Sequence, residues 1–117
     1  YAQAKVGPDG SLEGPLRTFA AKALKARDAL RRTFGQNVAI AVGEYGWTAK
    51  SLGVQGRSDA EGLRGRALRE SESLLKQAGF HSASLYTMVD DRETPGFGVF
   101  DRRFSTDAVR EGFLAAP

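Results

Sequence analysis

The feature that most constrains the fold is a run of five apolar residues that stops at a glycine and a carboxylate. The run covers Val38–Val42, and Gly43 and Glu44 follow it directly. A short stretch that is apolar throughout is typical of a parallel strand covered on both faces, whereas a half-exposed strand alternates apolar with polar residues. Val38–Val42 is therefore predicted to be a buried strand, with Glu44 just beyond its carboxyl end.

A helix is predicted on the amino-terminal side of this strand. Pro15 is suited to the first helical position, because its missing N–H would be unpaired there in any case. Apolar residues then recur at the spacing of one helical face, and Gly35 is placed to end the helix. Residues 1–14, rich in Gly-Pro and Asp-Gly pairs, are predicted to form a loop.

A second helix is predicted after a long loop over Tyr45–Arg57. The sequence Ser58-Asp59-Ala60-Glu61 fits a capping box, in which the serine oxygen caps the start of the helix, and Gly79 is placed to end it. Gly62 and Gly65 weaken a helix by about 1 kcal/mol each, so close packing against another element would explain them. The residues expected to be buried include Leu63, Leu74 and Leu75.

The rest of the chain continues the alternation of helix and strand. A second strand is predicted over Ser82–Val89, followed by Asp90 and Asp91, and Ser105 can cap a final helix. This order is typical of βαβ units, so we predict an α/β fold with adjacent parallel strands and a right-handed crossover between them. The 117 residues make one domain at most.

Composition narrows the classes of function. No apolar run approaches the roughly 18 residues of a membrane helix, so no membrane partner is expected. The net charge of +3 comes mainly from arginines mixed with acidic residues rather than from a basic stripe, so nucleic-acid binding is not expected. Cysteine is absent, which excludes disulfides and thiol catalysis. Neither a metal nor a cofactor is expected.

The loops divide into a long set and a short set. In parallel α/β folds, chemistry lies beyond the carboxyl ends of the strands, where Glu44 and Asp90 are expected. The connections on the opposite side, residues 35–37 and 79–81, are short. Glu44 is therefore placed like a catalytic residue, although a solvated loop acid is the alternative.

Aromatic residues surround the predicted position of Glu44. Aromatic rings can bind the apolar face of a sugar, and Tyr45 and Trp47 lie beside Glu44 in the sequence. Tyr45, Trp47 and Tyr86 are expected to form one wall of an open groove with Glu44. The alternative for Trp47 is core packing, because a sole tryptophan is often simply buried.

These motifs resemble a known family. The stretch "VAIAVGEYGW" is similar to the seventh strand of retaining glycoside hydrolases built on (β/α)8 barrels, a clan with its acid/base on strand four and its nucleophile on strand seven. "SASLYTMVDD" and "GFGVFD" resemble the eighth strand of that clan and the segment leading to its last helix. The resemblance covers residues 36–117. Many members carry a tryptophan near the end of strand eight, where this chain has Thr87 and Met88. The resemblance therefore does not predict which sugar is bound.

The resemblance implies a fold and a mechanism. The chain would be the C-terminal portion of a TIM barrel, a single incomplete domain over residues 1–117, with Glu44 as the nucleophile of a retaining double displacement. The mechanism needs a partner carboxyl about 5–5.5 Å away. In the clan this carboxyl comes from an Asn-Glu pair on strand four, which this chain lacks, so the fragment would be inactive alone. Asp90 and Asp91 are a less favoured source of it. Tyr45, Trp47, Tyr86 and Asp90 would bind a poly- or oligosaccharide substrate.

An incomplete barrel would need partners, and a second function is also compatible with the sequence. Half a barrel leaves open strand edges, so we expect it to need the missing N-terminal half or a second copy. Polysaccharide hydrolases of this kind are often exported, which is compatible with a secreted or extracytoplasmic protein. The alternative is a non-catalytic α/β module that binds carbohydrate or a protein partner through the Tyr45/Trp47 rim.

Overall fold

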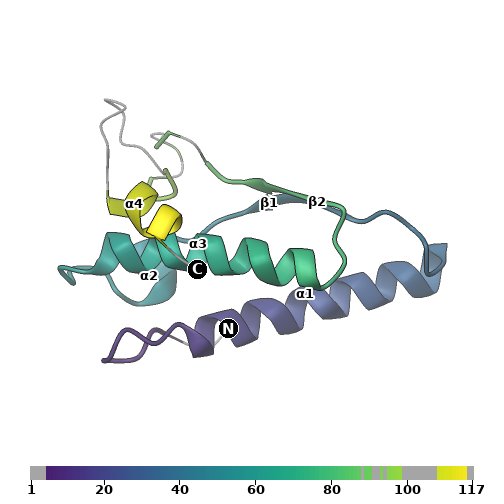
Figure 1. The fold of residues 1–117 in the computed structure, drawn as a ribbon, viewed down its shortest axis with the longest axis horizontal. Coiled ribbons are helices and arrows are strands. Elements are labelled where there is room, and N and C mark those ends of the chain that lie inside the picture. The colour runs from purple at the N-terminus through teal and green to yellow at the C-terminus, as the bar shows by residue number, and fades with distance from the viewer. Residues whose placement is uncertain (1–4, 88, 91–92, 94, 99–107, 116–117) are drawn as a thin grey trace.

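Two parallel strands packed against helices form the part of the chain that the computed structural model describes, residues 5–87, 89–90, 93, 95–98 and 108–115. The elements in chain order are α1 (Glu13–Phe34), β1 (Ala41–Tyr45), α2 (Ala49–Leu52), α3 (Ala60–Gln77), β2 (Ser82–Leu85) and α4 (Ala108–Ala115). The strands are adjacent and parallel, and α2 and α3 connect them (Figure 1). The predicted α/β class is confirmed. The predictions for Asp91 and Ser105 lie outside the described residues.

Helix α1 has nearly the predicted bounds. It begins at Glu13, two residues before Pro15, and ends at Phe34. Gly35 follows with a positive φ of 101°, and its N–H donates to the carbonyl of Arg31. The proline at the start and the glycine at the end therefore mark this helix correctly, because both suit a terminus better than a helix interior.

The predicted capping box at Ser58 is wrong. Helix α3 begins at Ala60 with Asp59 as its N-cap, and no side chain caps it. The Asp59 carboxylate accepts two hydrogen bonds from Arg57, each 2.8 Å, so it is already occupied. A capping box occurs instead at Thr48 and Ser51, where it opens the short helix α2 inside the predicted loop.

Both strands differ in extent from the prediction. β1 begins at Ala41 rather than Val38, so Glu44 lies inside the strand instead of beyond it. β2 begins at Ser82 as predicted but ends at Leu85. The two strands determine each other's first and last residues, because Ala41 pairs with Ser82 and Tyr45 with Leu85. Pairing between strands distant in sequence, rather than apolar character alone, therefore fixes the strand ends.

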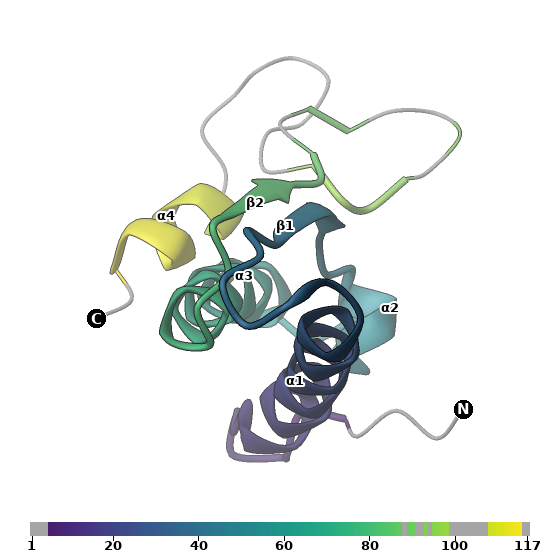
Figure 2. The ribbon, with the colours of Figure 1, turned by 90° about the vertical axis from the view of Figure 1, so that its right-hand side faces the viewer.

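The helices that the structure describes cover only one face of the sheet. In Figure 2, α1, α3 and α4 lie below or beside the strands, and no described helix lies on the opposite face. The residues that pack toward the helices are Val42, Tyr45, Ala83 and Leu85. The exposed residues of the two strands are Ala41, Gly43, Glu44, Ser82 and Ser84. The prediction of a strand covered on both faces is wrong, because the described chain supplies cover for one face alone.

Helix α4 packs closely on α3 at Gly65, as the close-packing explanation requires, whereas a Cβ atom on Gly62 would have no neighbour within 4 Å, so the explanation is wrong for that glycine. A Cβ atom on Gly65 would lie 2.0 Å from the carbonyl oxygen of Val109, and one on Gly112 would lie 2.5 Å from the carbonyl oxygen of Gly62. The backbones of the two helices therefore approach more closely than any side chain allows. None of the described helices is long and apolar enough to cross a membrane.

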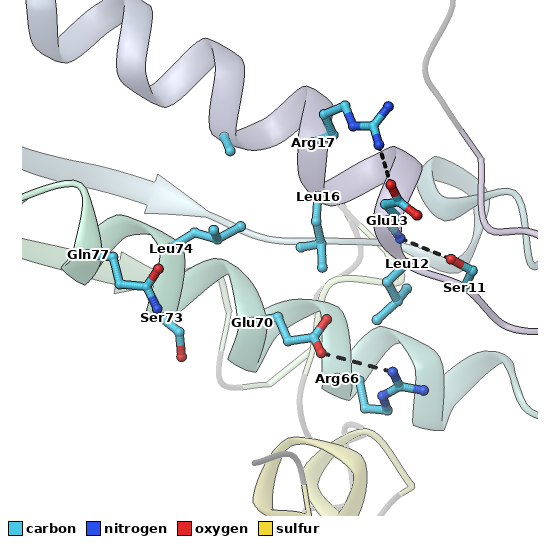
Figure 3. A pocket seen from close by; sticks show the side chains of 11 residues that line it. Ser11, Leu12, Glu13, Leu16, Arg17, Arg66, Glu70, Ser73, Leu74 and Gln77 are labelled. Atoms are coloured by element: carbon cyan, nitrogen blue, oxygen red, sulfur yellow. Dashed lines mark hydrogen bonds and ion pairs between the residues drawn. The ribbon is translucent and has the colours of Figure 1, made fainter.

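A groove of about 680 Å³ separates α1 from α3 (Figure 3). Leu16 and Leu74 line it, and the Arg66–Glu70 ion pair of 4.0 Å lies at its edge. Leu74 is half-buried because it faces this groove, so the prediction that it is buried is wrong. Leu63 and Leu75 are buried as predicted, with 5% and 2% of their surface exposed.

Candidate functional site

A bulge in β1 places Glu44 on the uncovered face of the sheet. Two residues, Gly43 and Glu44, separate the paired positions Val42 and Tyr45, whereas Ser84 alone separates their partners on β2. Two residues opposite one is the definition of a β-bulge, and such bulges re-aim side chains. Val42 and Tyr45 both pack toward the helices as a result, while Glu44 is exposed.

The Glu44 carboxylate is available for an external partner. Among the residues that the structure describes, none donates a hydrogen bond to it or forms an ion pair with it. It lies near the carboxyl end of β1, which is also the end where β2 stops, since Tyr45 pairs with Leu85. Beyond this pair, the N–H of Tyr86 donates to the carbonyl of Tyr45 at 2.8 Å. Glu44 therefore stands where two parallel strands end together.

A shallow pocket adjoins this carboxylate. We call it the Glu44 pocket; it has a volume of about 390 Å³, and its lining residues are Glu44, Tyr45, Gly46, Tyr86 and Phe97. The rings of Tyr86 and Phe97 meet edge to face, with centroids 5.5 Å apart. The structure thus brings Tyr86 together with Glu44, as the sequence predicts, and adds Phe97, which the sequence reasoning did not select.

Gly46 allows this pocket to form. A Cβ atom at this position would lie 2.4 Å from the carbonyl oxygen of Tyr86 and 3.0 Å from the Phe97 ring. The contact with the carbonyl oxygen is shorter than real Cβ atoms show, so only glycine lets the two segments meet here. The glycine between the two aromatic residues of the Glu-Tyr-Gly-Trp stretch therefore has a packing reason.

Tyr45 does not have the predicted placement. Although it borders the Glu44 pocket, only 8% of its surface is exposed, and it belongs to a core cluster with Leu68, Leu75 and Val109. The bulge turns it toward the helices, away from the open wall that the sequence reasoning expected. Burial raises the pKa of the Tyr45 phenol, the charge of Glu72 raises it further, and the charge of Arg69 opposes both.

The raised pKa of Tyr45 predicts a loss of stability in alkali. The unfolded chain releases the phenol proton near pH 10, whereas the folded protein holds it to a higher pH. The stabilisation is therefore fully present below about pH 10 and is lost as the pH rises through the folded-state pKa. Urea unfolding between pH 8 and pH 11 should show a smaller decline for Tyr45→Phe than for the wild type. Equal declines would show that Tyr45 does not titrate in this way.

Trp47 also departs from the predicted groove wall. Its indole N–H donates to the hydroxyl of Ser71 at 2.8 Å, and its ring lies 5.9 Å from that of Phe19. Its accessible part borders a second pocket of about 290 Å³, which shares Gly46 and Phe97 with the Glu44 pocket. A single wall of Tyr45, Trp47 and Tyr86 is therefore wrong, because the apolar surfaces of α1 and α3 hold the tryptophan.

Asp90 organises the segment that closes the Glu44 pocket. Its Oδ1 atom accepts hydrogen bonds from the N–H groups of Gly96 and Gly98, at 2.8 and 3.1 Å. Phe97 lies between these two glycines, so the carboxylate helps to place its ring. The predicted role of Asp90 in substrate binding stays a prediction, and the structure gives Asp90 this additional task.

Two polar residues on the core side of α3 bond to Trp47, although neither was predicted as a site residue and only Ser71 was expected to be buried. Arg64 and Ser71 are buried, with 3% and 0% of their surface exposed, and both bond to Trp47. A signal was present, because Arg64 shares a helical face with the buried Leu68 and with Ser71. A charged residue in that register points to an internal partner.

The arrangement offers carboxylate chemistry without an evident metal site. No group of three or more metal-ligating side chains lies together in the described part of the chain. Comparisons of the chain with known protein families, with curated proteins and with solved structures find no match. The exposed carboxylate with its neighbouring aromatic rings is thus the feature on which a functional proposal has to rest.

Proposed function

We propose that this chain forms part of a retaining glycoside hydrolase and that Glu44 is its nucleophile. The observation that carries the proposal is the position of Glu44, exposed on the uncovered sheet face at the carboxyl end of parallel strands. Tyr86 and Phe97 border the same pocket, and aromatic side chains suit the apolar face of a sugar. The sequence resemblance to a strand-seven nucleophile supports the same assignment.

The uncovered face supports the view that the chain is a portion of a TIM barrel. In such barrels the strands form an inner cylinder, helices cover the outside, and side chains from several strands fill the interior in layers. The exposed face here carries small residues at Ala41, Gly43, Ser82 and Ser84. Small side chains leave room for bulkier ones from further strands, which we propose are supplied by an upstream half or by a second copy.

A retaining mechanism needs a second carboxyl to act as acid and then as base, about 5–5.5 Å from the nucleophile. Asp90 is a poor source of it, because its Oδ1 already accepts two backbone N–H groups. We propose instead that it comes from another strand of the completed barrel, as the resemblance implies for strand four. The chain alone should then turn over no glycoside.

Covalent trapping of the intermediate tests the assignment. The chain joined to its upstream half is incubated with a glycoside that has a good leaving group and a slow second step, then digested with trypsin. The tryptic peptide of residues 33–50 contains Glu44 as its sole acidic side chain. We expect a mass increase of one glycosyl unit on this peptide, because the nucleophile forms an ester with the sugar.

The outcomes separate the candidate functions. An adduct on another peptide would assign the nucleophile elsewhere. If sugars bind but no substrate is cleaved and no adduct forms, the non-catalytic module is correct. In that case the binding surface would involve Tyr86 and Phe97, since Tyr45 is buried and Trp47 packs against Phe19 and Ser71.

A further inference from the structure

Arg64 is the one charged side chain that the described part of the chain buries. It lies on α3, and its guanidinium group donates at 3.2 Å to the carbonyl of Trp47 and at 2.6 Å to the carbonyl of Gly98. The same group contacts Glu61 at 3.0 Å, which supplies a countercharge. One planar group therefore joins three acceptors from three separate segments.

The two carbonyls belong to the segments that line the Glu44 pocket. Trp47 directly follows Gly46 in the loop after β1, and Gly98 directly follows Phe97 in the segment after β2. The N–H of Thr87 lies 3.4 Å from the carbonyl of Phe97, a weak contact. The bond from Arg64 to Gly98, at 2.6 Å, is much the shorter tie on this segment.

Arginine suits this position for geometric reasons. Its rigid fork presents several donors in one plane, whereas a lysine ammonium is a single point charge and cannot span both carbonyls in the same way. Stability alone is a weak reason to bury it, because Nε has no partner among the described residues and buried ion pairs often add little net stability. The fixed spacing of the two loops is the better explanation.

We infer that Arg64 is a positioning residue that holds the loop after β1 and the segment after β2 in register and so sets the shape of the Glu44 pocket. That this pocket binds substrate rests on the proposed function, but the positioning role of Arg64 does not. The coupling between the loops can be measured on the chain without any sugar, so a failure of the positioning role is distinguishable from a failure of the glycosidase proposal.

Hydrogen exchange and tryptophan fluorescence test this inference. Arg64→Lys keeps the charge but not the fork, and Arg64→Met removes both. We expect the amides of Gly96 and Gly98, which are bonded to Asp90, to exchange about tenfold faster or more in each variant. Acrylamide should also quench Trp47, the sole tryptophan, more efficiently. The amides of Ala78, just after α3, and His81, just before β2, serve as internal references, because they lie at the opposite end of these elements from the two loops.

Arg66→Lys is the matched control, because Arg66 lies on the same helix but is exposed and paired with Glu70. It should change neither readout. The inference is overturned if Gly96 and Gly98 exchange at the wild-type rate in both Arg64 variants. It is equally overturned if Arg64→Lys accelerates the reference amides by the same factor, because Arg64 would then support the whole fold rather than the two loops.

Discussion

Replacing Glu44 with glutamine in the assembled hydrolase is expected to lower kcat by on the order of 10⁴-fold or more. Glutamine keeps the size of the side chain and most of its hydrogen bonding, but a neutral amide cannot form the glycosyl ester. The fold should tolerate the change, since Glu44 is exposed and has no described partner. Initial rates on an aryl glycoside, with the unfolding temperature measured in parallel, give both quantities.

Glu93→Gln is the matched control for this experiment. Glu93 is an exposed carboxylate in the segment after β2, and its replacement removes the same charge. This control should retain wild-type kcat. Wild-type turnover by Glu44→Gln would show that the nucleophile is another residue. A loss of equal size in both variants would show that the charge of the region, and not one nucleophile, is required.

The sequence predicts helices α1 and α3 well because their signals are local, although it misses the short helix α2. The glycines after α1 and α3 and the proline in the first turn of α1 act through their own backbone preferences, so the helix ends are right within about two residues. The parallel pairing of the strands also follows from the order of elements alone. These features need no knowledge of what each segment contacts.

The details of the site depend on contacts between distant segments, which the sequence pattern does not contain. The run Val38–Val42 is uniformly apolar, so nothing in it shows that pairing starts at Ala41 opposite Ser82. The bulge then reverses the direction of Tyr45, a change that a one-residue shift in a strand always produces. Trp47 likewise turns inward, where its ring packs against Phe19 of α1 and its N–H donates to Ser71 of α3.

A contact between distant segments also makes Gly65 important for stability. An alanine there would place a methyl group 2.0 Å from the carbonyl oxygen of Val109, and backbone atoms cannot move aside without displacing α4. We expect Gly65→Ala to lower the free energy of unfolding by about 2 kcal/mol or more, despite the gain in helix propensity. Urea unfolding followed by circular dichroism measures this change.

Gly62→Ala is the control on the same helix. Nothing lies within 4 Å of the added methyl group, so the substitution should be neutral or raise the free energy of unfolding by up to about 1 kcal/mol. If Gly65→Ala is as stable as Gly62→Ala, α4 does not pack on α3 as described. The result also bears on the site, because Val109 packs with Tyr45 in one core cluster. Displacing α4 should loosen Tyr45 and, through the bulge, the adjoining Glu44.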